Sequence, residues 1–368
     1  MFGIFLLFAV TVMQVYVFSR INTVPFIKKR VPGKVIILTG LLFWICFFFS
    51  RIFGDSRIGP FFSILEFISM TWMAMLFLTF LPFFLVDLVT GFGYLLSRYA
   101  RSARGLALVA GLLLSAIALV QGLRPPVVQE YAIELSDLRS ELDGTTIVAI
   151  SDTHLGSLIG KKWLEARVTQ IAELKPDFIA LLGDISEEHG SPDEELLSAL
   201  NRLSAPLGVW AVLGNHEFHS HRNAGKSLLE KTNFHVLRNS WQQVLPGLVV
   251  AGVDDLTSVR QAGRGDGLIA EALKNRPQGT TILLSHTPWQ VEEAADVGVD
   301  VMLSGHTHGG QIWPFDYMVR LRYPFLEGWY KIKSMNLIVT RGAGEWGPRM
   351  RLWYPGEILR ITLHSKKN

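Results

Sequence analysis

Long apolar runs separated by short polar segments fill the first third of the chain. Four of these runs approach the roughly 20 residues that a helix needs to cross the hydrocarbon core of a bilayer. They cover residues 2–18, 35–53, 61–86 and 106–123. The alternative, four buried helices of a soluble domain, is disfavoured because so many long apolar runs exceed what such a domain holds. The sequence therefore predicts a transmembrane region with four helices at residues 1–124.

Beyond residue 124, short apolar and β-branched runs alternate with stretches of helical spacing. Strands are predicted at residues 145–150, 178–182, 208–213, 248–253, 281–284, 299–303, 337–339 and 358–363. Helices are predicted at residues 161–174, 194–203, 226–232, 268–275 and 290–295. Because near-continuous apolar strands are buried on both faces, this alternation indicates an α/β fold with helices over the sheets. We expect a linker and first strand at residues 125–143 and the second domain at residues 144–368.

Charge is distributed unevenly between these two regions. Residues 1–123 carry ten Lys and Arg against three Asp and Glu, whereas the rest carries 25 against 29. A mildly acidic second domain argues against a general nucleic-acid binder, which needs a basic surface. Eight basic residues lie in the loops between runs one and two and between runs three and four, whereas three lie on the other side of the membrane. Because basic residues are enriched in cytoplasmic loops, the side with eight is expected to be cytoplasmic. The second domain is then expected outside the cytoplasm.

Two acidic residues bracket the third apolar run. An acid inside a membrane is a candidate functional group, but Glu66 and Asp87 lie near the ends of the run. We therefore expect both side chains to reach the membrane interface. The single cysteine, Cys46, excludes an internal disulfide.

Polar residues with metal-binding side chains follow the predicted strands of the second domain. Five short blocks contain Asp152 and His154, Asp184, Asn215 with His216 and Glu217, His286, and His306 with His308. In open α/β sheets, ligand sites form at the carboxyl ends of strands. Glycines 183, 214 and 305 stand beside these blocks, where the backbone turns tightly or approaches a ligand. A lone histidine is usually a hydrogen-bonded core residue, but this arrangement favours a metal site with enough ligands for two ions.

In this order, the blocks D-x-H, G-D, G-N-H-E, a single His and G-H-T-H resemble the calcineurin-like metallophosphoesterase family over about residues 144–345. Residues 252–255 and 304–311 resemble a bacterial, membrane-linked branch that includes hydrolases of UDP-diacylglucosamine. The resemblance implies a four-layer α-β-β-α sandwich with a dinuclear metal centre. The implied metal ligands are Asp152, His154, Asp184 and His308 for one ion and Asp184, Asn215, His286 and His306 for the other, with Asp184 bridging.

The same resemblance assigns two residues outside the ligand set. His216 is the implied catalytic histidine and proton donor, and Glu217, where many members have Asp, could orient it. Two divalent ions about 4 Å apart can clamp a phosphoryl group and share a hydroxide that attacks phosphorus. Carboxylate and imidazole ligands suit Mn, Fe, Zn or Co better than Ca, and the sequence does not choose among them. His219, His221 and Arg222 are weaker candidates for contacts with a substrate phosphate, since a solvated loop explains them as well.

These features predict a membrane-anchored, metal-dependent phosphoesterase acting on a monoester, diester or pyrophosphate. Aromatic and basic residues interleave over residues 313–354, which suits either a lipid headgroup and membrane interface or a core. The membrane region favours a lipid-linked or membrane-proximal substrate. UDP-diacylglucosamine is one such substrate, but its hydrolysis would need access to the cytoplasmic leaflet, which conflicts with the orientation expected from loop charge. The alternatives are an anchored nucleotide or phosphoprotein phosphatase and a non-catalytic membrane scaffold. The sequence leaves the oligomeric state open.

Overall fold

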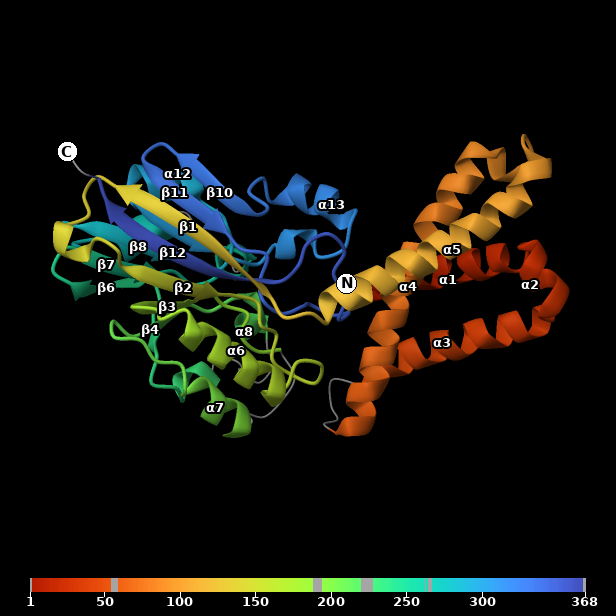
Figure 1. The fold of residues 1–368 in the computed structure, drawn as a ribbon, viewed down its shortest axis with the longest axis horizontal. Helices are drawn as coiled ribbons and strands as arrows, with labels where there is room; N and C mark the ends of the chain where they lie inside the picture. The colour runs from red at the N-terminus through yellow and green to blue at the C-terminus, as the bar shows by residue number, and fades with distance from the viewer. Residues whose placement is uncertain are drawn as a thin grey trace. The chain divides into compact units, whose positions relative to one another are not determined.

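The computed structural model describes residues 2–53, 59–187, 194–219, 228–261, 263 and 267–366 (Figure 1). Contacts divide the chain into two units. One, called the membrane unit below, comprises Met1–Arg124 with Gly347–Leu352, and the other, the catalytic unit, comprises Pro125–Trp346 with Trp353–Asn368. The segment Gly347–Leu352 therefore belongs with the N-terminal helices although it lies near the end of the sequence. Within that unit, the Arg351 backbone N–H donates to the Ala118 carbonyl at 2.9 Å.

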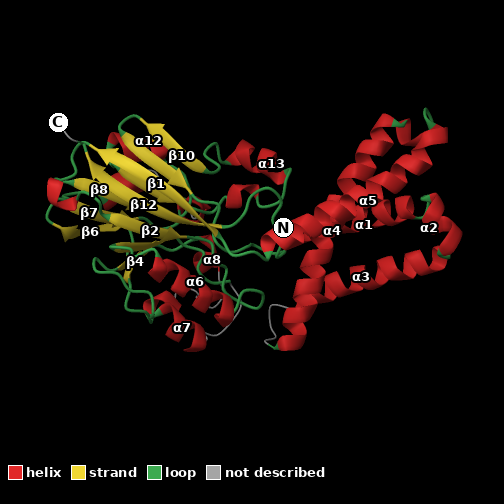
Figure 2. Ribbon diagram, in the orientation of Figure 1, coloured by secondary structure: helices red, strands yellow, loops and turns green. Residues whose placement is uncertain are grey.

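Four long helices make up most of the membrane unit, in agreement with the predicted transmembrane region (Figure 2). They are α1 (Phe2–Ile21), α3 (Gly33–Phe53), α4 (Pro60–Val89) and α5 (Ser97–Gly122), joined by the short α2 (Pro25–Arg30) and η2 (Gly91–Gly93). All four are long and apolar enough to cross a membrane. Helix α5 begins well before the predicted residue 106, because Arg and Ala favour a helix even where the sequence is no longer apolar.

Asp87 differs from the expectation that it reaches the membrane interface. Its side chain is fully buried between α1, α4 and α5. One carboxylate oxygen accepts from the Arg104 Nε at 2.9 Å, and the other accepts from the Tyr16 hydroxyl at 2.7 Å and lies 2.5 Å from the Arg20 Nε. The acid therefore ties three helices together. We refer to these four residues as the Asp87 cluster.

Two mixed six-stranded sheets form the centre of the catalytic unit, which confirms the predicted α/β fold. The first has the order β1-β12-β2-β3-β4-β5 and the second β10-β11-β9-β8-β7-β6. The strands are β1 (Val127–Leu135), β2 (Thr146–Ile150), β3 (Phe178–Leu181), β4 (Val209–Ala211), β5 (His235–Val236), β6 (Ser240–Leu245), β7 (Leu248–Gly252), β8 (Thr280–Leu284), β9 (Val301–Ser304), β10 (Gly328–Ile332), β11 (Met335–Val339) and β12 (Glu357–Ser365). Strands β2, β3 and β4 run parallel, as do β7, β8 and β9.

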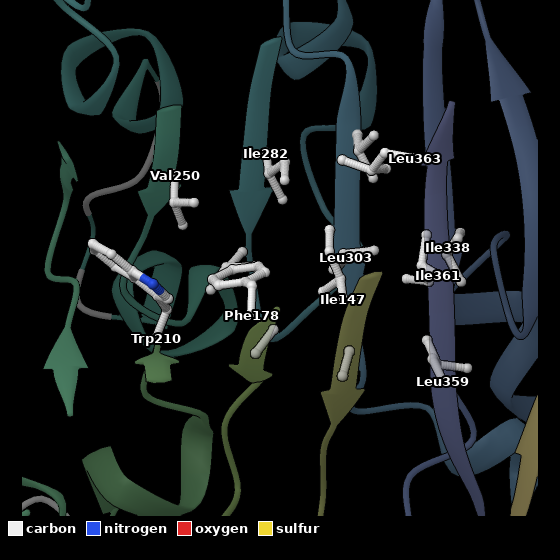
Figure 3. Packing of buried hydrophobic residues seen from close by; sticks show 14 of the residues in the cluster. Ile147, Phe178, Trp210, Val250, Ile282, Leu303, Ile338, Leu359, Ile361 and Leu363 are labelled. Carbon is white, nitrogen blue, oxygen red and sulfur yellow. The ribbon is translucent and has the colours of Figure 1, made fainter. Parts of the chain in front are cut away.

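The alternation of side chains along each strand places the sheets between helices. Ile147 and Ala149 of β2 join the apolar core between the two sheets, with Phe178 and Leu303 (Figure 3). The intervening Val148 and the other residues of that face pack instead against α6 (Lys161–Glu173) and α7 (Glu194–Leu200). The second sheet is covered in the same way by α10 (Leu256–Gln261), α11 (Leu268–Ala272) and α12 (Val291–Asp296). Strands with two buried faces have no polar face, which explains their continuous apolar sequence.

Some elements were not predicted from the pattern. Strands β6 and β10 stand at the edges of the second sheet and are only partly buried. An edge strand needs fewer apolar residues, so its sequence resembles a loop. Helix α13 (Phe315–Arg322) buries only Asp316 among its residues and has no apolar inward stripe to reveal it. The helix predicted at residues 226–232 lies partly outside the described residues.

Candidate metal centre

The candidate ligands lie directly beyond the carboxyl ends of neighbouring strands. Asp152 follows β2, Asp184 follows β3, and Asn215 begins the short helix α8 (Asn215–His219) after β4. In the second sheet, His286 follows β8 and His306 follows β9. Because the strands within each sheet are parallel here, their ends deliver all these side chains to one edge of the catalytic unit. Position after a strand was thus a sound guide to the site.

The backbone at this edge is held in an unusual conformation. Asp152, His154, Asp184, His306 and His308 all have a positive φ, between 46° and 72°. Non-glycine residues adopt this left-handed region at a cost of order 1–3 kcal/mol each. Such strain persists when the surrounding fold imposes it, and its concentration at the candidate ligands marks a functional site.

Two glycines are required for close approach at the same edge. A Cβ atom on Gly214 would lie 2.1 Å from an Asp184 carboxylate oxygen, and one on Gly305 would lie 2.1 Å from the Ser151 hydroxyl oxygen. Neither contact is sterically tolerable, so any side chain there would displace the residues beside it. Glycine at these positions lets the strand ends come close enough for their side chains to share a site.

The first group of converging side chains is Asp152, His154 and His308. The Nε2 atoms of His154 and His308 are 3.2 Å apart, and the His308 Nε2 is 3.4 Å from an Asp152 oxygen. All three residues are buried, and their ligand atoms lie within 4.8 Å of one another.

The second group converges on His286. Its Nε2 lies 3.2 Å from an Asp184 oxygen, 3.2 Å from the Asn215 amide oxygen and 3.3 Å from the His306 Nδ1. The same Asp184 oxygen lies 4.0 Å from the His154 Nε2. Asp184 therefore stands between the two groups.

The chemistry of this arrangement fits divalent metal ions. Buried imidazole nitrogens and carboxylate oxygens aim at common points, and these are the donors that Mn, Fe, Co and Zn prefer. The electrostatics agree: burial opposes protonation, yet Glu187 and Asp184 raise the pKa of His154 and Asp184 raises that of His286. A site that raises histidine pKa values despite burial has a negative potential, which attracts cations.

Hydrogen bonds fix the orientation of two of these histidines. The His286 Nδ1 is 2.8 Å from the Leu182 carbonyl oxygen, which leaves Nε2 turned toward Asp184. The His306 Nε2 is 2.7 Å from the Tyr323 hydroxyl oxygen, which leaves Nδ1 turned toward His286. Burial and the neighbouring His286 lower the pKa of His306 to about 4. Partners of this kind set ring orientation in metal sites.

His216 is less buried and forms a third group with His154 and Asp184, whose ligand atoms also lie within 4.8 Å of one another. Its backbone N–H donates to Asp184 at 2.9 Å, its Nε2 lies 4.0 Å from an Asp184 oxygen, and its Nδ1 lies 3.3 Å from a Glu187 oxygen. Burial lowers the pKa of His216, but Glu187 and Asp184 outweigh it and raise the pKa to about 9.

Glu217 has a different role from the expected one. Its carboxylate accepts backbone N–H groups from Asp184, Ile185, Ser186 and Gly214, at 2.7–3.2 Å. It therefore shapes the two loops that carry the ligands, and the carboxylate beside the His216 ring nitrogen is Glu187. Burial and the nearby Asp184 raise the pKa of Glu217 to about 7.

Glu187 is a candidate site residue that the sequence pattern did not predict. It contacts both His154 and His216, at 3.1 and 3.3 Å. Burial opposes its ionisation, but the two imidazoles outweigh burial and hold the pKa of Glu187 below its usual value. The only signal was its place three residues after Asp184, inside a loop rich in acids.

The weaker substrate-binding candidates cannot be compared with this geometry. His219 ends α8, and its side chain is not among those described. His221 and Arg222 lie outside the described residues, so all three stay predictions. From the aromatic stretch, Trp346 lies near the site, with its ring centroid 6.3 Å from that of His216.

Comparisons with known proteins identify a family for the chain. The model of the calcineurin-like phosphoesterase family matches residues 145–310. An uncharacterised metallophosphoesterase of Campylobacter jejuni is 29% identical over 382 residues, which cover 99% of this chain and 100% of that protein. A transmembrane protein with a metallophosphoesterase domain from Danio rerio is 31% identical and is covered over 62% of its length by 70% of this chain. YkuE of Bacillus subtilis, an uncharacterised metallophosphoesterase, is 32% identical; 64% of this chain covers 85% of it.

Proposed function

The chain belongs to the calcineurin-like phosphoesterase family, and from this premise we propose that it hydrolyses a phosphoester or pyrophosphate bond with two divalent metal ions at the bilayer that its helices enter. The observation that carries the proposal is the convergence of two ligand groups on Asp184, whose oxygen lies 3.2 Å from His286 and 4.0 Å from His154. Asp152, His154, Asp184 and His308 would hold one ion, and Asp184, Asn215, His286 and His306 the other.

Divalent ions held by these residues would supply Lewis-acid chemistry at phosphoryl oxygens and would lower the pKa of water. The protein contributes the proton for the leaving oxygen. His216 suits this task because its ring faces the ligand groups and Glu187 and Asp184 raise its pKa to about 9. A general acid works best with a pKa near the working pH, and the positive potential of bound cations would lower the pKa of His216 toward it. The Glu187 carboxylate holds the ring and stabilises its positive charge.

For the substrate, we propose a lipid-linked or membrane-proximal phosphoester. The support is the membrane unit, which confines the site to the neighbourhood of a bilayer. UDP-diacylglucosamine is one specific candidate, from the resemblance to the membrane-linked branch. The alternative substrates are a nucleotide and a phosphoprotein. The alternative function is a membrane scaffold, which would hydrolyse no substrate.

A panel assay on the full-length protein tests the proposal. The protein, loaded with Mn and purified in detergent, is given a nitrophenyl monoester, a nitrophenyl diester, a UDP-linked lipid and a phospholipid. Turnover of at least one compound that is lost in His216→Ala supports hydrolysis. Absence of turnover on all four, and also on a nucleotide and a phosphopeptide, with two metal ions bound, would favour the scaffold.

The side of the membrane is a separate proposal. From the distribution of basic residues we propose that the catalytic unit lies outside the cytoplasm. A cytoplasmic UDP-linked lipid as substrate would contradict this orientation. A C-terminal reporter that is active on only one side of the membrane distinguishes the two. Activity on the cytoplasmic side would overturn the orientation and keep UDP-diacylglucosamine in the panel.

A further inference from the structure

Helix α13 (Phe315–Arg322) presents large apolar side chains to solvent. Tyr317 and Met318 are 64% and 65% exposed, and Leu321 is 88% exposed. These three residues are three and four positions apart, so they share one face of the helix. The opposite face holds the buried Asp316 and packs on the 3-10 turn η4 (His308–Gly310). Three large apolar side chains exposed side by side form a contiguous patch, which is typical of an interaction surface, whereas single exposed apolar residues are common on any protein.

The helix that carries the exposed face contacts the candidate metal centre through η4 and through the residue that follows the helix. The turn η4 on which it packs begins with His308, one of the candidate ligands. The residue after the helix is Tyr323, whose hydroxyl oxygen is 2.7 Å from the His306 Nε2. The helix that carries this face is therefore connected to two of the candidate metal ligands.

Charge on the same helix narrows the choice of partner. Arg320 and Arg322 occupy its last turn and are exposed, and the Arg322 guanidinium lies 4.9 Å from the Trp289 ring. Apolar and aromatic side chains flanked by arginine characterise helices that lie in the interface of a bilayer with anionic lipids. The rest of the catalytic unit is mildly acidic, so this basic and apolar face is a local feature.

The protein's own helices provide the reason to consider a bilayer as the partner. Four helices of this protein are long and apolar enough to cross a membrane.

We propose that α13 docks on the membrane surface, with Tyr317, Met318 and Leu321 in the interfacial region and Arg320 and Arg322 against anionic headgroups. Docking itself requires no catalysis. Its consequence, which rests on the proposed function, is that the metal centre takes its phosphoester from a lipid in the bilayer rather than from solution.

A single fluorescent label tests the docking. The chain has one cysteine, so Cys46→Ser provides a background in which Leu321→Cys carries an environment-sensitive fluorophore. The matched control is Glu141→Cys, in η3 (Ser140–Leu142), where the side chain is 69% exposed. That turn precedes β2, whereas the metal centre follows it, so the control lies at the opposite end of the sheet.

The full chain is reconstituted in vesicles of phosphatidylcholine and phosphatidylglycerol, with and without brominated acyl chains. We expect a blue shift and bromine quenching of the label at position 321 and neither at position 141. Solvated, unquenched emission at both positions would overturn the proposal. A blue shift without bromine quenching that grows with protein density would also overturn it, since a second copy of the chain would then cover the face.

The substrate consequence has its own readout. In Leu321→Glu, the ratio of turnover on phosphatidic acid in vesicles to turnover on a soluble nitrophenyl ester is expected to fall about tenfold, since one leucine loses its apolar environment. Leu321→Met, which keeps an apolar side chain, should retain the ratio. Quenching at position 321 without turnover on any ester would support docking and refute the proposed function, whereas turnover with an unchanged ratio in Leu321→Glu would refute the substrate consequence alone.

Discussion

The metal centre and the Asp87 cluster both bury carboxylates, but they satisfy them in opposite ways. In the membrane unit, each oxygen of Asp87 meets a guanidinium of Arg104 or Arg20, and one also accepts the Tyr16 hydroxyl. In the catalytic unit, the carboxylates of Asp152 and Asp184 face imidazole nitrogens that also face one another.

The difference separates structural burial of charge from functional burial. Asp87 meets groups that already carry positive charge, so the cluster has no need of a cation and stabilises the packing of three helices. Imidazoles that converge on a carboxylate offer lone pairs to a common point, and only a positive charge placed there satisfies them together. Burial alone therefore does not identify a site; the direction of the ligand atoms does.

The largest effect is expected for Asp184→Asn. An amide removes the charge that both ligand groups share, so the protein should lose nearly all turnover and at least one of the two metal ions. Turnover on the nitrophenyl ester and metal content by mass spectrometry measure both. Full retention of metal and rate would show that the two groups do not depend on Asp184. An unchanged thermal unfolding temperature of the metal-free protein serves as the control for folding.

His216→Ala should reduce turnover by about 10²–10⁴-fold, the usual contribution of a general acid. Metal content should stay at the level of the unmodified protein, because the other seven candidate residues still provide the ligands. Loss of metal together with activity would make His216 a ligand, and the separation between metal binding and proton transfer would disappear.

Asp87→Asn tests the structural half of the comparison. The change leaves the Arg104 and Arg20 guanidinium groups without a counter-charge, and breaking a buried pair in this way costs on the order of 3 kcal/mol. The detergent-solubilised protein should unfold at a lower temperature. Glu66→Gln, the same chemical change at another acid of this unit, should have a smaller effect. Loss of metal in Asp87→Asn with unchanged unfolding would assign Asp87 to the functional class instead.

The smallest effect is expected for Glu187→Gln. Glu187 contacts His154 and His216 but is not among the proposed ligands, and loss of such an outer partner costs about 10–100-fold in activity or metal affinity. Steady-state turnover and metal titration measure the two quantities. Glu195→Gln, on the surface of α7, is the matched control. A loss as large as that of Asp184→Asn would move Glu187 into the ligand set.

The sequence allowed prediction of the sheets and the ligand positions because both depend on local pattern. Strands buried on two faces have continuous apolar sequences, and Asp152, Asp184 and His306 follow such strands directly. Glu187 escaped prediction because its contact with His216 depends on how two loops from different strands meet. Helix α13 escaped because its apolar residues face outward, which no rule of amphipathic burial anticipates. The contacts of Asp87 likewise depend on the packing of three helices.

The segment Gly347–Leu352 bears on how the protein can be divided. Arg351 and Met350 are fully buried, and the Arg351 backbone N–H donates to the α5 carbonyl of Ala118. A protein cut at Pro125 to obtain the phosphoesterase without its membrane helices would keep these six residues and lose the helix that receives them. Recombination that exchanged the anchor would meet the same obstacle, because a new set of helices would need a matching surface. The N-terminal helices and the segment Gly347–Leu352 therefore form one structural piece.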